Sequence, residues 1–264
     1  MSRTLFRATL HQHRTSMFWF AVGLVSYAWM MTWFYPTIGE EYGKLIETFP
    51  PELLAIFGGS EVPFASLGGY FQTEYLGIMW ILIVSAAVII YASRSFAGEI
   101  AAGTMEFVLS HPVSRVQVAL TRVAVLVVYA VVLAAASFVP LEVFGPAYDI
   151  NLGWDVLWVL MAFGVLFILA VGGFAMMLSA IFKGSGRPGA IAAGVLGTLW
   201  IADLLSGASE IAGALDPANI IAYWQPGLII NGGEVAAEAW WLYGAIAAVT
   251  LVASVVIFTR RDVA

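Results

Sequence analysis

Two glutamates, Glu99 and Glu106, stand in the polar interval 98–115 between two hydrophobic runs. In a helix that turns 100° per residue, positions seven apart fall on one stripe, so both carboxylates are expected on the same face. Pro112 ends the predicted helix, and His111 before it favours extended backbone. These residues therefore predict a short acidic helix that is suited to docking on a basic surface.

The turn after the proline carries the signals of a second helix start. Ser114 and Gln117 have the S-x-x-Q spacing of a capping box, and Val113 and Val118 are placed as a hydrophobic staple. The chain thus leaves one hydrophobic run, forms a short helix, turns at a proline and enters the next run. We call this segment, residues 94–115, the elbow.

Motifs for catalysis or metal binding are absent from the sequence. It contains no H-E-x-x-H, no G-x-S-x-G, no G-x-x-x-x-G-K-[ST] and no cysteine. His11 and His13 lack the i,i+3 or i,i+4 spacing of paired ligands and stand close to arginines, so we interpret them as solvated surface. We therefore expect no catalytic, cofactor-binding or metal-binding residue in this chain.

The composition is that of an integral membrane protein. Of the 264 residues, 61% are hydrophobic and 11% are charged, and the mean hydropathy is +0.92. Soluble domains carry about 25% charged residues. Six apolar runs reach or approach the roughly 20 residues that a helix needs to cross a bilayer. They are 17–35, 75–92, 116–139, 156–182, 189–205 and 239–259.

The expected fold is therefore an all-α integral membrane protein with six transmembrane helices in a single domain over 1–264. Arg122 lies one to two turns inside the third run. We expect its side chain to extend, or snorkel, from there to the membrane surface.

The charged residues predict the orientation of these helices. With the N-terminus inside, ten of the eleven Lys and Arg residues are cytoplasmic and only Lys44 is outside, as the positive-inside rule requires. Of the 17 acidic residues, Glu99, Glu106 and Asp262 fall inside and the other 14 outside. We therefore expect both termini in the cytoplasm and a multi-pass protein of the inner (plasma) membrane.

The N-terminal residues 1–16 have two interpretations. Their arginines cluster on one side and their apolar residues on the other, which is typical of an amphipathic helix in the headgroup layer. The same residues are equally consistent with a cytoplasmic extension of the first span. A cleaved signal peptide is excluded because no small-x-small cleavage site follows the apolar run.

Two longer segments, 36–74 and 207–238, are expected on the outer side. Within the first, 50–59 has proline at its start and glycines at its end, which predicts a short helix. The second contains Tyr223 and Trp224 and is followed by Trp240 and Trp241. We interpret these aromatic residues as an interfacial belt that anchors the chain among membrane lipids.

The elbow also carries a family resemblance. Residues 99–115 have the form E-x-x-x-G-T-M-E-F-V-L-S-x-P-V-S-R, which resembles the cytoplasmic coupling segment of ABC-2 type permeases. The P-x-E-L-L-x-x-F-G run at 50–58 and the F-x-R-R-D ending at 258–262 resemble further parts of that family. The resemblance covers the chain from its amphipathic start to Arg261.

This resemblance implies the membrane subunit of an ATP-driven exporter. It implies a second permease chain, most simply a homodimer, and two copies of a separate ABC ATPase that binds ATP and Mg²⁺. Glu99 and Glu106 would meet basic groups of the ATPase, Met105 and Phe107 would fill an apolar notch, and Gly103 would allow close approach. The implied coupling residues are Glu99, Gly103, Thr104, Met105, Glu106, Phe107, Leu109, Pro112, Ser114 and Arg115.

The main alternative is a single-chain secondary transporter that is not driven by ATP. Such proteins need an ionisable or coordinating group inside the membrane, and Asp203, at the outer end of the fifth run, is the only candidate. The apolar, aromatic-rich sequence suits an amphipathic drug, peptide or lipid as substrate. Membrane lipids are expected partners and nucleic acid is not.

Overall fold

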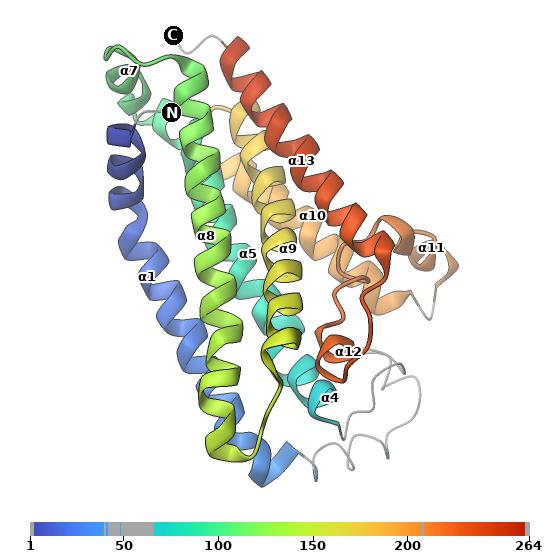
Figure 1. Ribbon diagram of the computed structural model, residues 1–264. Helices are drawn as coiled ribbons and strands as arrows, with labels where there is room; N and C mark the ends of the chain where they lie inside the picture. Colours follow the sequence, from blue (N-terminus) through green and yellow to red (C-terminus); the bar gives the residue numbers. More distant parts are fainter. Residues whose placement is uncertain (1–2, 40, 42–47, 49–65, 207–208, 262–264) are drawn as a thin grey trace.

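The computed structural model describes residues 3–39, 41, 48, 66–206 and 209–261, and every regular element among them is helical (Figure 1). Six helices are long and apolar enough to cross a membrane. They are α1 (Arg3–Phe34), α5 (Ile78–Ser93), α8 (Arg115–Phe144), α9 (Trp154–Ile181), α10 (Gly186–Leu205) and α13 (Ala237–Arg260). The prediction of six membrane-spanning helices is therefore confirmed by length and composition.

Short helices connect these six. The segments expected on the outer side contain η1 (Tyr35–Gly39), α4 (Leu67–Phe71), η3 (Gln72–Leu76), α11 (Glu210–Gly213), η6 (Asp216–Ala218) and α12 (Pro226–Ile230), and η5 (Gly145–Tyr148) joins α8 to α9. The elbow contains η4 (Arg94–Gly98), α6 (Glu99–Ala101) and α7 (Thr104–Leu109). The helix predicted at 50–59 lies outside the described residues.

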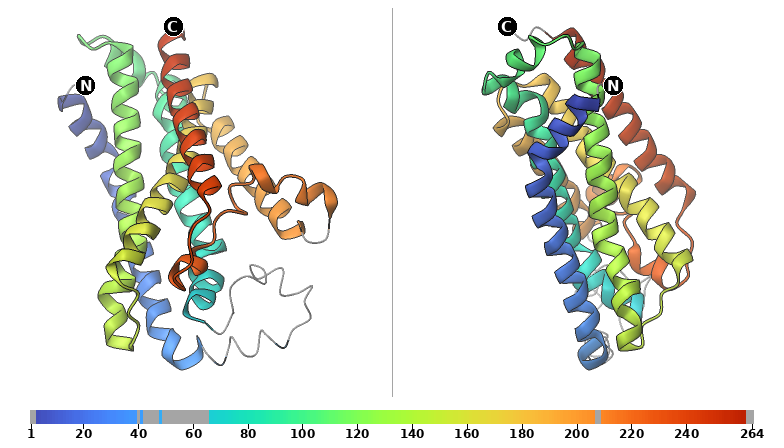
Figure 2. Two further views of the ribbon diagram at one scale, coloured as in Figure 1. Left: turned by 45° about the vertical axis from the view of Figure 1, so that its right-hand side comes forward. Right: turned by 60° about the vertical axis from the view of Figure 1, so that its left-hand side comes forward.

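The long helices form one bundle with α9 near its centre. Helix α9 packs along α13, α5 and α8, while α1 packs mainly against α8 (Figures 1 and 2). Helix α10 lies at the edge, where it contacts α5 and α9. The start of α1, the end of α13 and the elbow helix α7 lie at the same end of the bundle.

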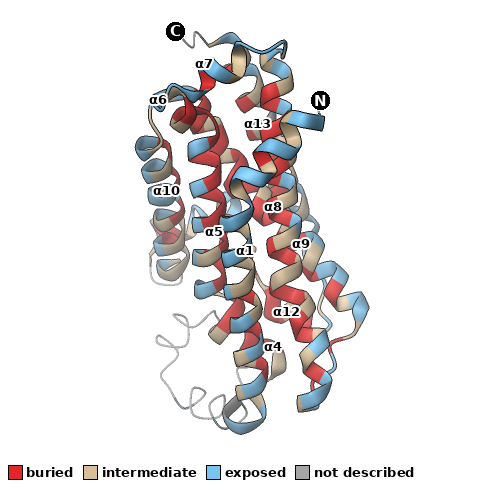
Figure 3. Ribbon diagram, turned by 90° about the vertical axis from the view of Figure 1, so that its left-hand side faces the viewer, coloured by how far each residue is buried: buried red, intermediate tan, exposed pale blue. Residues whose placement is uncertain are grey.

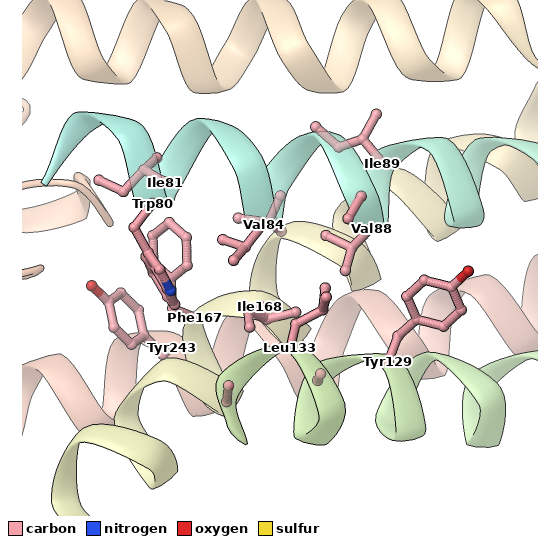
Figure 4. Close-up of a cluster of buried hydrophobic side chains, with 14 of the residues drawn as sticks. Trp80, Ile81, Val84, Val88, Ile89, Tyr129, Leu133, Phe167, Ile168 and Tyr243 are labelled. Atoms are coloured by element: carbon pink, nitrogen blue, oxygen red, sulfur yellow. The ribbon is translucent and has the colours of Figure 1, made fainter. Parts of the chain in front are cut away.

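The core is apolar and aromatic. Figure 4 shows Trp80, Val84 and Val88 of α5 pointing toward Leu133 of α8 and Phe167 of α9, and all of them are buried. The outside of the bundle also carries large apolar side chains, among them Trp19, Trp241 and Val249. In Figure 3 the buried face of α5 contrasts with the largely exposed α10. An apolar exterior of this extent is expected where lipid surrounds the protein.

The N-terminal residues belong to the first long helix. Helix α1 runs from Arg3 to Phe34 without interruption, so residues 3–16 are helical and continue directly into the first apolar run. Leu5, Phe6 and Leu10 pack against the core and Thr9 is buried. Their placement at the membrane surface stays a prediction.

The two outer segments fold onto each other through α4 and α12 (Figure 1). Asn231 after α12 accepts a hydrogen bond from the Gly68 amide at 3.0 Å, and the Gly227 amide donates to Gln72 Oε1 at 2.9 Å. A Cβ atom at Gly68 would collide with the carbonyl oxygen of Gly227. This close backbone approach explains why both positions are glycine.

One aromatic residue of the outer segments lies inside the bundle. The Trp224 ring stacks on Trp80 with centroids 4.3 Å apart, and its indole N–H donates to the Leu76 carbonyl at 2.7 Å. The interfacial position expected for Trp224 is therefore wrong, because ring stacking and a buried acceptor stabilise it in the core. Trp241, in contrast, is 78% exposed, which the interfacial belt requires.

Candidate functional site

The elbow is not one helix but a chain of three short ones. Gly103 separates α6 from α7 and has a φ of 71°, in the left-handed region that glycine adopts without strain. The single helix expected from Glu99 to Ser110 is therefore wrong, and Glu99 and Glu106 do not share a helical face. A Cβ atom at Gly103 would meet nothing within 4 Å, so this glycine is required by the backbone turn and not by close packing within the chain.

Glu99 points into the bundle, where it meets Arg122. Arg122 Nη2 lies 2.6 Å from Glu99 Oε2, and their side chains are 3% and 10% exposed. The second terminal nitrogen, Nη1, donates to Thr9 Oγ1 at 2.6 Å. The pair thereby links the elbow to α8 and α1.

The snorkelling expected for Arg122 is therefore wrong, since a carboxylate within the bundle neutralises the cation where it stands. Tyr91 donates to the Arg122 carbonyl at 2.7 Å and stacks on Tyr129 at 4.8 Å. Tyr129 in turn donates to the His13 carbonyl at 2.9 Å. The His13 ring packs edge-on against Tyr91 at 4.9 Å and is only partly exposed, so its expected solvation is also wrong.

A buried serine fixes the other side of the elbow. Ser179 Oγ of α9 accepts hydrogen bonds from the amides of Phe96 and Ala97 at 3.2 and 3.0 Å, and it donates to the Ser93 carbonyl at 2.9 Å. It thus binds three backbone groups in and next to the π-helical turn η4 and links that turn to α9. The Ala97 carbonyl accepts from the Gly184 amide at 3.2 Å. The sequence analysis missed Ser179, because a serine in an apolar helix has many possible roles.

The predicted coupling residues on α7 differ in their exposure. Thr104, Glu106 and Phe107 are exposed, the last by 71%, whereas Met105 is fully buried in this chain. Leu109 is partly buried and packs against the core. Thr104 Oγ1 also donates to the Glu99 carbonyl at 3.1 Å across the glycine turn. The surface of α7 therefore presents one aromatic ring beside one carboxylate.

The second half of the elbow follows the sequence prediction. The capping box is confirmed, because Ser114 Oγ accepts from the Gln117 amide and the Gln117 side chain accepts from the Ser114 amide, both at 3.1 Å. Pro112 is exposed in the turn after α7. Arg115 donates to the Arg261 carbonyl. Arg261 donates to the carbonyls of Ala180 and Phe182, and burial lowers the pKa of its guanidinium.

The contacts of the elbow tie it to the long helices. Within the described residues, no group of three or more His, Asp or Glu side chains could hold a metal ion. The elbow combines an exposed surface on α7 with a buried base that is bonded to α1, α8 and α9. A contact made on α7 is therefore connected to three of the long helices.

The all-helical bundle and its six membrane-length helices define a multi-pass membrane protein. The elbow lies at the end of the bundle where α1 begins and α13 ends. The chain matches the profile of the ABC-2 family transporter protein over residues 37–263, so it belongs to this family. No curated protein sequence matches it. The chain is accordingly an ABC-2 membrane permease domain, a non-catalytic transporter subunit.

Proposed function

We propose that this chain is the permease subunit of an ATP-driven exporter and that the elbow receives its ATPase. ABC-2 permeases work with ABC ATPases. The observation that carries the proposal is Phe107, which is 71% exposed on α7. Helix α7 lies at the end of the bundle where α8 begins and α13 ends (Figure 1). Lipid covers exposed aromatic rings along the bundle, whereas at this end a protein partner is the natural cover.

We assign the ten proposed coupling residues to four roles according to their burial and contacts. Thr104, Glu106, Phe107 and Pro112 are exposed and would contact the ATPase directly. Glu99 and Met105, expected from the sequence to do the same, are buried and would support the docking surface from behind. Gly103 would set the turn between these layers, while Leu109, Ser114 and Arg115 would hold the elbow on the bundle.

Force would pass from α7 into the bundle through the buried contacts. Movement of α7 displaces Glu99, whose partner Arg122 belongs to α8 and whose second neighbour Thr9 belongs to α1. Ser179 transmits the same displacement to α9. Closure of the ATPases on nucleotide would thus tilt several helices together, as in rigid-body switching.

The proposed assembly contains two permease chains, most simply as a homodimer, and two ATPase chains that supply the ATP and Mg²⁺ sites. The elbow and both termini would face the cytoplasm, in accord with the basic residues at this end and the positive-inside rule. The protein would lie in the inner (plasma) membrane and export an amphipathic compound.

The experiment is copurification of tagged permease with candidate ATPases, combined with export measured in the same cells. Phe107→Ala should retain less than half of the ATPase per permease, because a docked aromatic ring contributes about 2 kcal/mol or more. Phe18→Ala is the matched control, since Phe18 is 58% exposed but lies on α1 along the bundle. Wild-type ATPase retention and export in Phe107→Ala would contradict the docking site, and export by the permease alone would favour a secondary transporter.

A further inference from the structure

A long groove runs between α5 and α10, at the edge of the bundle. Its volume is about 620 Å³, which lies within the range of small-molecule sites. The walls are almost entirely apolar and include Ile81, Leu82, Ile89, Ala193, Leu196 and Trp200. Figure 4 shows Ile81 and Ile89 pointing away from the core side of α5, where Val84 and Val88 lie. The groove thus lies on the side of α5 that faces away from Val84 and Val88, and Ile81, Ile89 and Leu196 form both its wall and the edge of the core.

One end of the groove is cationic. Arg94 lines it beside Ser185 and Gly186, where α10 begins, and the lining contains no acidic residue. Arg94 is exposed, and its side chain makes no hydrogen bond or ion pair with the described residues. Gly98 allows Arg94 and Ser185 to pack closely at this end of the groove, because a Cβ atom at position 98 would lie 3.2 Å from Arg94 Cβ and 3.4 Å from Ser185 Cβ. A guanidinium next to the first turn of a helix attracts an anion.

The middle of the groove carries a second, independent signal. Ser85 is 3% exposed and lines the groove, and its hydroxyl finds no hydrogen-bond partner in the described part of the chain. A buried hydroxyl without a hydrogen-bond partner destabilises the protein, so a ligand that supplies a hydrogen-bond partner gains affinity. Ser85 stands nine positions before Arg94, about 13 Å along a helix that rises 1.5 Å per residue.

We propose that this groove binds the exported substrate and that the substrate is an anionic amphiphile. Its anionic head would lie at Arg94, its apolar chain would follow α5 and α10, and a hydrogen-bonding group partway along the chain would reach Ser85. A membrane phospholipid fits less well, because its polar groups are gathered at the head and leave Ser85 unpaired. This inference rests on the proposed function, which supplies the transport.

The experiment uses the purified full-length permease in nanodiscs of zwitterionic lipid. Nitroxide-labelled octadecanoate quenches the fluorescence of a nearby indole. The part of the quenching that is lost in Trp200→Phe comes from the groove. Unlabelled octadecanoate should compete, and octadecylamine should not. An octadecanoate with a hydroxyl at mid-chain should compete about fivefold better than the plain acid, because one hydrogen bond is worth about 1 kcal/mol.

Two variants test the residues that define the ligand. Arg94→Gln should weaken octadecanoate binding about fivefold, as expected for one arginine near an anionic head. Arg187→Gln is the matched control, since Arg187 is exposed and lies one position beyond Gly186, outside the groove lining. Ser85→Ala should leave binding of the plain acid intact and remove the preference for the hydroxylated one.

Several results would overturn the inference. Equal competition by the amine and the acid, or unchanged binding in Arg94→Gln, would exclude an anionic ligand. Quenching that Trp200→Phe does not reduce would show that a second copy of the chain or bulk lipid occupies the groove. In the assembled complex, the bound acid should stimulate ATP hydrolysis. Binding without stimulation would refute its role as substrate, whereas failure to assemble with any ATPase would instead refute the proposed function.

Discussion

Replacement of Glu99 by glutamine tests whether the buried ion pair holds the elbow on the bundle. Glu99 and Arg122 lie 2.6 Å apart with little exposure, so neither is stabilised by water. Arginine cannot give up its proton in a protein. Glu99→Gln therefore leaves a buried cation that retains a hydrogen-bond acceptor but has lost its counter-charge.

The expected destabilisation follows from this geometry. Breaking a buried pair by removing one partner costs about 3–5 kcal/mol, and the glutamine oxygen places Glu99→Gln near the lower end of that range. Arg122→Met should cost less, because the remaining carboxyl group can bind a proton and become neutral. The double variant Glu99→Gln/Arg122→Met removes both charges and should be less destabilised than Glu99→Gln alone.

The assay is reversible unfolding of the four proteins in mixed micelles, followed by tryptophan fluorescence. Glu106→Gln is the matched control, since Glu106 is exposed on the same elbow and surface substitutions usually change stability by no more than about 0.5 kcal/mol. Strictly additive effects of the two single substitutions would refute the reasoning, because partners in one ion pair must couple. The reasoning would also be refuted if Glu99→Gln lowered the free energy of unfolding no more than Glu106→Gln does.

Two further predictions follow from the fold. A single cysteine in place of Ser185, in the α9–α10 turn, should be labelled by an impermeant reagent from the cytoplasm. A single cysteine in place of Asp149, after the C-terminal end of α8, should be labelled from outside. Labelling of both from one side would contradict the six-helix topology. Ser179→Ala should lower the unfolding free energy by about 1–3 kcal/mol, because it leaves two buried amides unpaired, whereas Ser110→Ala, on the exposed end of α7, should have little effect in the same measurement.

The sequence was sufficient for the features that are local. Long apolar runs decide membrane-spanning helices regardless of what packs around them, and the bounds of α5, α9, α10 and α13 lie within about three residues of the predicted runs. Helix α8 continues past its predicted end at 139 to Phe144, and α1 begins at Arg3, well before its predicted start at 17. The capping box at Ser114 was likewise predicted because its partners are only three positions apart.

The contacts of the elbow were not predictable in the same way. Glu99 and Arg122 are 23 positions apart, and a helical projection of residues 99–110 assumed a continuous helix that Gly103 interrupts. One available signal was Arg122 itself, because an arginine inside an apolar run calls for a partner in the bundle. Trp224 was misplaced for a related reason: composition shows that an aromatic residue is present but not which ring it stacks on.

The two glutamates of the elbow show how burial separates residues that look alike in sequence. Desolvation of Glu99 is tolerable only because Arg122 neutralises it, so Glu99 has no charge to offer a partner and its effect must pass through the position of α7. Glu106 remains solvated, so in the proposed docking site it would be a rim charge, whose main influence is on the rate and salt dependence of association. A partner that contacts Glu106 and Phe107 would therefore depend on Glu99 without touching it. The reason is that the short segment that carries the proposed docking surface also attaches that surface to α1 and α8.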